Sequence, residues 1–203
     1  MKILKKKFYR QDAVTVAEQL VGNVLVRERE GQIFLNRIIE TEAYFGEDDT
    51  ACHASKGRTQ RTEVMYQAGG VAYIYLIYGM YHMLNIVTGS RDHPQAVLIR
   101  ALEPLQSNLQ LTAAIPKTTL STKIPKSRLK TNGPGKLCRY LAIDKAFNGW
   151  DVTIKDKLWL TDRESEEFDI SSGPRIGIDY AHPEDRDKAW RFWLKGSPYV
   201  SRR

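Results

Sequence analysis

The apolar positions near the N-terminus repeat at the spacing of one helix face, at Val14, Ala17, Leu20 and Val21. Asp12 comes before them, and aspartate is common at the start of a helix because its side chain accepts a hydrogen bond from a free backbone amide. Gly22 comes after them and is typical of a helix end. The pattern therefore predicts a helix from Asp12 to about Val21.

Strand-like segments account for most of the other apolar positions. Asn23–Arg29 and Gln32–Tyr44 flank a Glu30–Gly31 pair that is typical of a turn. The longest apolar region, Val71–Val87, is rich in tyrosine and broken by Gly79, which predicts two paired strands. Further strands are predicted at Ala96–Leu102, Leu158–Leu160, Arg175–Tyr180 and Trp190–Leu194.

A second helix and a long loop are predicted between these strands. Lys136–Phe147 has helical spacing and follows a Gly-Pro-Gly sequence. The segment from Pro104 to about Lys130 is rich in Ser, Thr, Pro and Lys, which indicates a surface loop or insertion. We find no internal repeat and no linker, so we predict one domain over residues 1–203.

The composition is that of an ordinary soluble protein, with 42% hydrophobic residues and a mean hydropathy of -0.44. No apolar run approaches the roughly 18 residues that a membrane-spanning helix needs. The N-terminus, MKILKKKFYRQD, is basic but lacks the apolar stretch of a secretory signal. Cys52 and Cys138 stand far apart, without a metal-binding or redox spacing. We therefore expect a reduced, cytoplasmic location rather than secretion, and no membrane partner.

Charge is the first functional hint. The formal net charge is +7, and no acidic residue occurs between Glu103 and Asp144, where seven lysines and arginines do. Basic surfaces favour phosphate-rich partners, because Lys and Arg contacts release the counterions condensed on nucleic acids. A solvated, lysine-rich loop would give the same pattern, so charge indicates nucleic acid without deciding for it.

The segment Ile38–Tyr44 runs from the apolar core directly into carboxylates. In a regular strand, residues two apart share a face, so Ile38, Glu40, Glu42 and Tyr44 are predicted to lie on one side. A carboxylate beside an aromatic ring at a strand end is a plausible site. The alternative is an edge strand that leaves the core, with both glutamates solvated.

Tyrosines dominate the predicted hairpin. Tyr73 and Tyr75 are predicted to share one strand face, and Tyr78, Gly79 and Met80 lie at the tip. Tyrosine favours strands in any protein, which is one explanation. An exposed aromatic and methionine on a basic protein also fit a wedge that inserts between DNA bases.

Other common chemistries find no support. The four histidines, His53, His82, His93 and His182, show no metal-ligand spacing. The sequence NGPGKL at Asn132–Leu137 lacks the spacing and the hydroxyl residue of a P-loop, and no G-x-S-x-G occurs. We expect neither a metal nor a cofactor.

Several of these segments together resemble one family. The sequences are ETEAY (Glu40–Tyr44), ACHA (Ala51–Ala54), YIYLIYGMYHMLNI (Tyr73–Ile86), LIRALEPL (Leu98–Leu105), NGPGKLCRYLAI (Asn132–Ile143) and RFWLKGSPYVS (Arg191–Ser201). In this order they resemble the alkyladenine, or 3-methyladenine, DNA glycosylase family over nearly the whole chain. One departure is Gln60, where the family often has proline before arginine.

The resemblance implies a reaction and a substrate. Enzymes of this family take part in base excision repair: they flip alkylated or deaminated purines out of double-stranded DNA and hydrolyse the N-glycosidic bond with a Glu-activated water. The lesions implied are 3-methyladenine, 7-methylguanine, hypoxanthine and ethenoadenine. Extrusion costs a few kcal/mol, least for a damaged or poorly paired base.

The resemblance also implies residue roles. Glu42 corresponds to the general base, Arg100 to the arginine that helps to hold the water, and the backbone carbonyl of Ile176 to a further water ligand. The remaining roles are to enclose the base (Tyr44, His53 and Tyr75), to bond the leaving group from the backbone (Ala51 to His53), to reject normal guanine (Asn85), and to fill the gap in the stack (Tyr78, beside Met80). Glu40 is assigned a structural role.

The resulting expectation is a monofunctional glycosylase without lyase activity, acting as a monomer in a bacterial type of cytoplasm and meeting the nucleoid through its substrate. A bifunctional enzyme would need an amine nucleophile, and no lysine matches such a position. Two alternatives remain: a non-catalytic nucleic-acid-binding module, and a glycosidase that acts on free nucleosides. For the fold we predict an α+β class, with a curved, mostly antiparallel sheet flanked by helices and a protruding DNA-inserting hairpin.

Overall fold

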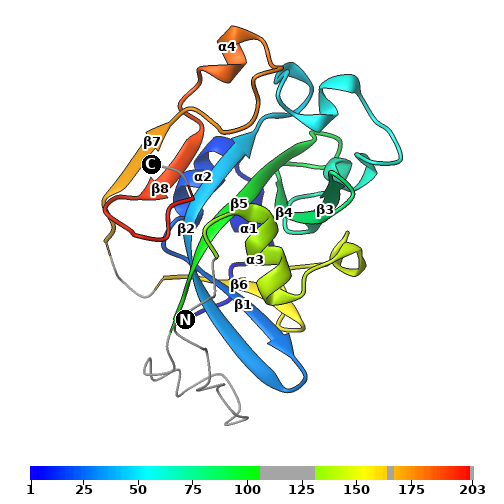
Figure 1. Ribbon diagram of the computed structural model, residues 1–203. Coiled ribbons are helices and arrows are strands. Elements are labelled where there is room, and N and C mark those ends of the chain that lie inside the picture. Colours follow the sequence, from blue (N-terminus) through cyan, green and yellow to red (C-terminus); the bar gives the residue numbers. More distant parts are fainter. Residues whose placement is uncertain (106–130, 164–166, 202–203) are drawn as a thin grey trace.

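A curved antiparallel sheet of eight strands forms the centre of the protein, shown in Figure 1 as a computed structural model that describes residues 1–105, 131–163 and 167–201. The strands are β1 (Val24–Arg29), β2 (Gln32–Tyr44), β3 (Ala72–Ile77), β4 (Tyr81–Thr88), β5 (Gln95–Pro104), β6 (Leu158–Thr161), β7 (Ile170–Gly173) and β8 (Arg191–Leu194). Six follow the order β3-β4-β5-β2-β1-β6, while β8 pairs with both β2 and β7. The predicted α+β class and the single antiparallel sheet are confirmed. The surface loop predicted from Pro104 to about Lys130 lies almost entirely outside the described residues, because residues 106–130 are not described.

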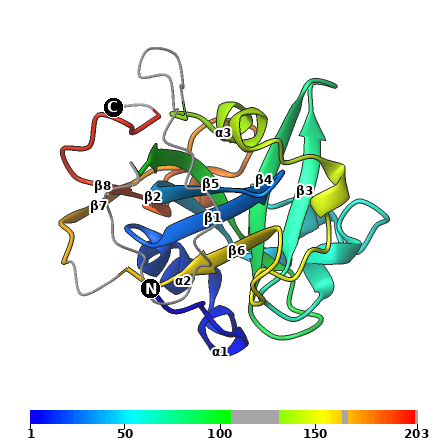
Figure 2. The ribbon, with the colours of Figure 1, turned by 90° about the horizontal axis from the view of Figure 1, so that it is seen from below.

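Within these described residues, four short α-helices accompany the sheet: α1 (Lys6–Tyr9), α2 (Ala13–Leu20), α3 (Pro134–Leu141) and α4 (Pro183–Arg186). Figure 2 shows the strong twist of the sheet, with β3 and β4 running at a steep angle to β1 and β6. One large core cluster contains buried side chains from α2, from α3 and from every strand except β7. None of the helices in the described parts of the chain has the length and apolar character to span a membrane.

The first predicted helix is confirmed as α2, with one difference in its buried face. Asp12 caps it, because its Oδ1 accepts a hydrogen bond from the Thr15 amide at 2.9 Å. The buried positions are Ala13, Val16, Ala17 and Leu20. Val14, predicted on this face, is only partly buried at its edge. Ala13 is fully buried although its side chain is small, which hydrophobicity alone does not reveal.

Strand β2 is central rather than at an edge. On one side it pairs with β5 over Asn36–Tyr44, and on the other with β1 over Gln32–Arg37 and then with β8 over Glu40–Glu42. Glu40 and Glu42 are both 0% exposed. The alternative of an edge strand with solvated glutamates is therefore wrong, and both carboxylates lie within the protein.

Two matched β-bulges interrupt the pairing of β2 with β5. Ile38 pairs with Leu102 and Glu40 with Ala101, so Ile39 is an extra residue in β2. Thr41 then pairs with Ile99, so Arg100 is an extra residue in β5, and the register is restored.

The bulges change which side chains share a face. Ile38 belongs to the large core cluster, and the Thr41 hydroxyl donates to the carbonyl of Ala17 in α2 at 2.7 Å. Glu40 and Glu42 instead both reach Arg100. The prediction that Ile38 shares their face is wrong, because the extra residue inverts the alternation along β2.

Strands β3 and β4 form the predicted hairpin, with Ile77 paired to Tyr81. Tyr78 and Gly79 both have positive φ, 52° and 64°, which glycine tolerates and tyrosine adopts only under constraint. The tip is exposed: the exposed fraction is 81% for Tyr78 and 64% for Met80. A hollow of about 210 Å³ lies beside it, lined by Met80, Tyr81, His82 and residues of α3 and its C-terminal turn.

Two predicted elements differ from the structure. Arg175–Tyr180 is not a strand; the strand in this region is β7, which ends at Gly173 before Pro174. Pro174 cannot donate to a ladder, and Gly177 has a φ of 77°, so the segment becomes an irregular loop. The helix predicted at Lys136–Phe147 begins earlier, at Pro134, and ends at Leu141, because Ala142 takes a left-handed conformation.

Candidate active site

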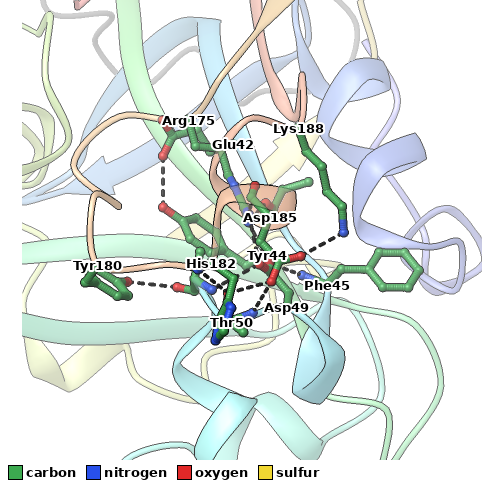
Figure 3. Close-up of polar contacts among 12 residues, drawn as sticks. Glu42, Tyr44, Phe45, Asp49, Thr50, Arg175, Tyr180, His182, Asp185 and Lys188 are labelled. Carbon is green, nitrogen blue, oxygen red and sulfur yellow. Dashed lines mark hydrogen bonds and ion pairs between the residues drawn. The ribbon is translucent and has the colours of Figure 1, made fainter.

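The carboxylate of Glu42 lies where three parts of the chain meet. Its Oε2 accepts hydrogen bonds from the Tyr44 hydroxyl at 3.0 Å and from Arg100 Nη1 at 3.1 Å. Its Oε1 accepts one from the backbone amide of Ile176 at 2.7 Å. Figure 3 shows the Tyr44 ring directed toward this carboxylate from the end of β2. The geometry brings together Glu42, Tyr44, Arg100 and Ile176, four of the predicted site residues.

Burial raises the pKa of Glu42, because the charged form loses its hydration. The positive charge of Arg100 opposes this effect, as do the hydrogen bonds from Ile176 and Tyr44. Burial and these donors therefore act on the pKa of Glu42 in opposite directions.

Glu40 lies on the same face with a different set of partners. It accepts hydrogen bonds from Arg100 Nε at 3.3 Å, Arg191 Nη1 at 3.1 Å, and the amide and hydroxyl of Ser201 at 2.6 and 2.9 Å. Two arginines and a chain segment near the C-terminus thus surround this carboxylate. Arg100 is shared, so it links Glu40 to Glu42.

An aromatic group, defined here as Tyr44, His53, Tyr73 and Tyr75, lies next to the carboxylates. The His53 and Tyr75 rings meet edge to face with centroids 4.5 Å apart, and Tyr73 and Tyr75 lie 5.6 Å apart on the same face of β3. Tyr44 and Tyr75 pack against one small core cluster that also contains Cys52. Three predicted base-enclosing residues are therefore neighbours.

His53 is held in one neutral form. Arg61 Nη2 lies 3.2 Å from His53 Nε2 and can only donate, so Nε2 accepts and the proton is on Nδ1, which lies 3.0 Å from the Tyr73 hydroxyl. Burial lowers the pKa of His53 to about 4, and the charge of Arg61 lowers it in the same direction. The sequence analysis assigned no role in the site to Tyr73 or Arg61. It did place Tyr73 on the same strand face as Tyr75, because residues two apart in a strand share a face.

Ala51 lies in a segment whose backbone groups are partly occupied. Its amide donates to Asp49 Oδ1 at 3.1 Å, and its carbonyl accepts from the Tyr180 hydroxyl at 2.9 Å (Figure 3). The amide of Cys52 donates to the Asp49 carbonyl at 2.8 Å. Asp49 and Tyr180 therefore fix this segment beside the aromatic group.

A buried ion pair supports the same region. Nη1 and Nη2 of Arg175 donate to Asp49, at 2.5 and 2.8 Å, and the guanidinium carbon lies 5.0 Å from the centroid of the Tyr44 ring. Because Arg175 precedes Ile176, the pair also positions the amide that reaches Glu42. Sequence reasoning missed both members; Asp49 stood within an acidic cluster, and no local signal distinguishes a buried carboxylate there from a solvated one.

Helix α4 anchors the segment from outside. Asp185 accepts hydrogen bonds from the amide and hydroxyl of Thr50 at 2.9 and 2.5 Å, and from Lys188 at 2.8 Å (Figure 3). These hydrogen bonds hold the pKa of Asp185 well below its usual range. The loop that carries Ala51 and His53 is thus tied to the C-terminal part of the chain.

Among the predicted residues, Tyr75 and Asn85 lie on the strands of the hairpin, and Tyr78 and Met80 lie at its tip. Asn85 is buried, and its amide nitrogen donates to the carbonyl of Tyr73 at 3.1 Å, which fixes its side chain beside the aromatic group. Tyr78 and Met80 project from the tip into solvent. Within the described ranges, no group of three or more His, Cys, Asp or Glu side chains is placed to hold a metal ion.

Comparison with known proteins shows the family of the chain. Residues 7–198 match the profile of the family described as methylpurine-DNA glycosylase. Similar proteins occur in Desulfitobacterium hafniense (46% identical; 99% of each chain), Borreliella afzelii (44%; 98% of this chain and all of the relative) and Clostridium novyi (44%; all of both chains). All three bear a provisional name as 3-methyladenine DNA glycosylases. The chain belongs to the methylpurine-DNA glycosylase family.

Proposed function

We propose that this protein excises damaged purines from double-stranded DNA by hydrolysing the N-glycosidic bond with a water that Glu42 activates. The proposed lesions are 3-methyladenine, 7-methylguanine, hypoxanthine and ethenoadenine. Membership of a DNA glycosylase family supports the reaction class and the place in base excision repair. The finer assignments are supported by the geometry below.

The observation that carries the proposal is the setting of Glu42. It is 0% exposed, and Tyr44, Arg100 and Ile176 direct three donors at its oxygens. As the glycosidic bond breaks, the sugar gains oxocarbenium character and positive charge. A buried carboxylate stabilises that charge and accepts a proton from the attacking water.

Arg100 and Ile176 have complementary parts in this proposal. Arg100 Nη1 lies 3.1 Å from Glu42 Oε2 and favours the ionised form that a base needs. The Ile176 amide donates to Glu42 Oε1, which places Ile176 next to the carboxylate. The carbonyl of the same residue is therefore close to where the attacking water would bind. Glu40 is the less suitable base, because two arginines and Ser201 already occupy its oxygens.

The aromatic group supplies the surface for an extruded base. Stacking on aromatic side chains is worth about 1–3 kcal/mol per base, which offsets much of the cost of extrusion. Tyr44, His53 and Tyr75 would enclose the purine in this way. Asn85, held rigidly by the carbonyl of Tyr73, would meet the exocyclic amino group of an undamaged guanine and exclude it.

The leaving group needs different help for different lesions. A cationic 3- or 7-alkylpurine departs as a neutral base. Hypoxanthine is neutral and departs more easily when a donor bonds to it. The amides of Ala51 and Cys52 already donate to Asp49, so we assign this role to the amide of His53.

The hairpin tip is proposed as the wedge. Tyr78 and Met80 expose 81% and 64% of their surface, which is unusual for such residues and typical of side chains that insert between base pairs. Tyr78 would fill the space that the extruded nucleotide leaves. The basic character of the chain, with a net charge of +7, supports DNA as the partner.

We propose a monofunctional enzyme that acts as a monomer without metal or cofactor. The groups that contact Glu42 are a hydroxyl, a guanidinium and an amide, none of which is the primary amine that a Schiff base requires. Strand cleavage should therefore follow only from alkaline treatment of the abasic product.

The test uses duplexes that carry one hypoxanthine or one 7-methylguanine, with EDTA present. Wild type should release both bases, Glu42→Gln should release neither above background, and strands should break only after alkali. If both proteins bind the duplex and neither releases a base, a binding module is the better description. Turnover of free inosine that is indifferent to Tyr78→Ala would instead favour a nucleoside glycosidase, and breakage without alkali would contradict the monofunctional assignment.

A further inference from the structure

Arg61 lies against the aromatic group, on the loop that follows His53–Lys56. Its Nη2 is 3.2 Å from His53 Nε2, and its guanidinium carbon is 5.2 Å from the centroid of the Tyr75 ring. The side chain itself is exposed. A positive charge thus rests on two of the three residues that we propose to enclose the base.

The charge of Arg61 is uncompensated, in contrast to that of Arg58 three residues earlier. Arg58 donates to Glu63 at 2.7 and 2.9 Å and to Asp92 at 3.1 Å, so two carboxylates neutralise it. Among residues 1–105, 131–163 and 167–201, no carboxylate forms an ion pair with Arg61. Its contacts are a neutral imidazole, the face of Tyr75 and the Tyr73 hydroxyl, none of which carries a formal charge.

We propose that Arg61 determines specificity by favouring neutral damaged purines over cationic ones. This inference rests on the proposed function, in which His53 and Tyr75 contact the extruded base. It does not depend on which face of Tyr75 the base occupies. If the base takes the same face as Arg61, the two cations become neighbours; if it takes the opposite face, Arg61 draws electron density from the ring and weakens its attraction for a cation.

The chemistry of bond cleavage also predicts that Arg61 favours neutral purines over cationic ones. When the glycosidic C–N bond breaks, its electron pair goes to the purine, water adds to the sugar carbon, and the proton of that water goes to Glu42. A neutral purine thereby becomes an anion until it is protonated, and the guanidinium of Arg61 stabilises it. A cationic purine becomes neutral and gains no such benefit, while its approach to Arg61 is opposed by repulsion.

The size of the effect follows from Coulomb's law. For unit charges about 7 Å apart in a largely solvated setting, with an effective dielectric constant of about 40–80, the interaction changes a rate about three- to sevenfold. Because the two lesion classes respond in opposite directions, the ratio of their rates should change by about tenfold or more. High salt should reduce the change, since Arg61 is exposed.

The experiment compares Arg61→Gln with Arg58→Gln, an arginine from the same loop whose charge is already neutralised. For each protein, kcat/KM is measured on otherwise identical duplexes carrying hypoxanthine or 7-methylguanine, with spontaneous depurination subtracted. Arg61→Gln should lower the hypoxanthine to 7-methylguanine ratio about tenfold, whereas Arg58→Gln should leave it unchanged. Arg61→Lys, which keeps the charge, should stay near the wild-type ratio.

Several results would overturn the inference. Equal losses on both lesions in Arg61→Gln would make Arg61 a phosphate contact or a loop residue, and an unchanged ratio would make it an ordinary surface arginine. A change of similar size in Arg58→Gln would mean that loop integrity, not charge, sets the ratio. Wild type that releases neither base would instead contradict the proposed function itself, so the two failures are distinguishable.

Discussion

Glu40 and Glu42 are two residues apart on β2, are both fully buried, and both pair with Arg100, yet their surroundings differ. Glu40 is enclosed by two arginines and by Ser201 near the C-terminus. Glu42 has one arginine, a tyrosine hydroxyl and a loop amide, and it lies beside the aromatic group. Under the proposed function, the composition of the partners, rather than burial, would distinguish the structural carboxylate from the reactive one.

The largest expected effect comes from Glu42→Gln. It removes the base but retains the size of the side chain, so the rate of base release should fall by about 10²–10⁴, the usual contribution of a general base. Thermal stability should change little, because a buried charge is removed and Arg100 keeps Glu40. Single-turnover kinetics and a melting curve on the same preparation check both parts. Substantial residual activity would assign the base elsewhere.

Glu40→Gln should give the opposite pattern. The variant removes the buried carboxylate that Arg100 and Arg191 share, and breaking a buried pair typically costs about 3 kcal/mol of unfolding free energy. Activity per folded molecule should remain close to wild type. Denaturant unfolding, together with rates normalised to the folded fraction, makes the comparison. If Glu40→Gln is folded and as inactive as Glu42→Gln, the distinction between the two carboxylates is wrong.

Arg100→Gln removes the charge that both carboxylates share, and its effect should depend on pH. Burial raises the pKa of Glu42 and Arg100 opposes that rise, so activity requires pH above this pKa and is lost as pH falls through it. The variant should lose about tenfold in kcat/KM near neutral pH, as expected for one charged hydrogen bond, and more at lower pH. A pH–rate profile whose acidic limb does not move would show that Arg100 acts only on the water.

Tyr44→Phe should have the smallest effect and sharpens the comparison, because Tyr44 contacts Glu42 and not Glu40. Loss of one hydroxyl donor should lower kcat/KM about threefold, with the ring still present to stack on the base. Stability should fall by about 1 kcal/mol or less. A loss as large as that of Glu42→Gln would mean that the hydroxyl takes part in proton transfer rather than only orienting the carboxylate.

Local patterns predicted much of the sheet. The bounds of β2 were predicted correctly as Gln32–Tyr44, and the β3–β4 hairpin was recognised from its tyrosines and Gly79, because pairing partners close in sequence leave a local pattern. The bulge at Ile39 was not predicted, since it depends on how β5 pairs with β2. The strand predicted at Arg175–Tyr180 failed for a similar reason: the side chain of Arg175 turns inward to Asp49, far away in sequence.

In the candidate site, too, some residues were predicted from the sequence and others were missed. Its principal members, such as Glu42, Tyr44 and Arg100, came from resemblance to a family, and the structure brings them within hydrogen-bonding distance. The residues that hold them in place, including Asp49 and Asp185, were missed. An aspartate in an acidic stretch gives no sign of whether an arginine from another part of the chain will cover it.

The matched bulges also bear on how the sequence can change over evolution or in design. Ile39 is an extra residue, so deleting it would leave Ile38, Glu40, Thr41 and Glu42 in regular alternation, with Thr41 still toward α2 and Glu42 still on the face of the site. Deleting Arg100 would remove the other extra residue, but also the charge on which both carboxylates depend. We therefore expect this part of the chain to tolerate a change of length in β2 more readily than the same change in β5.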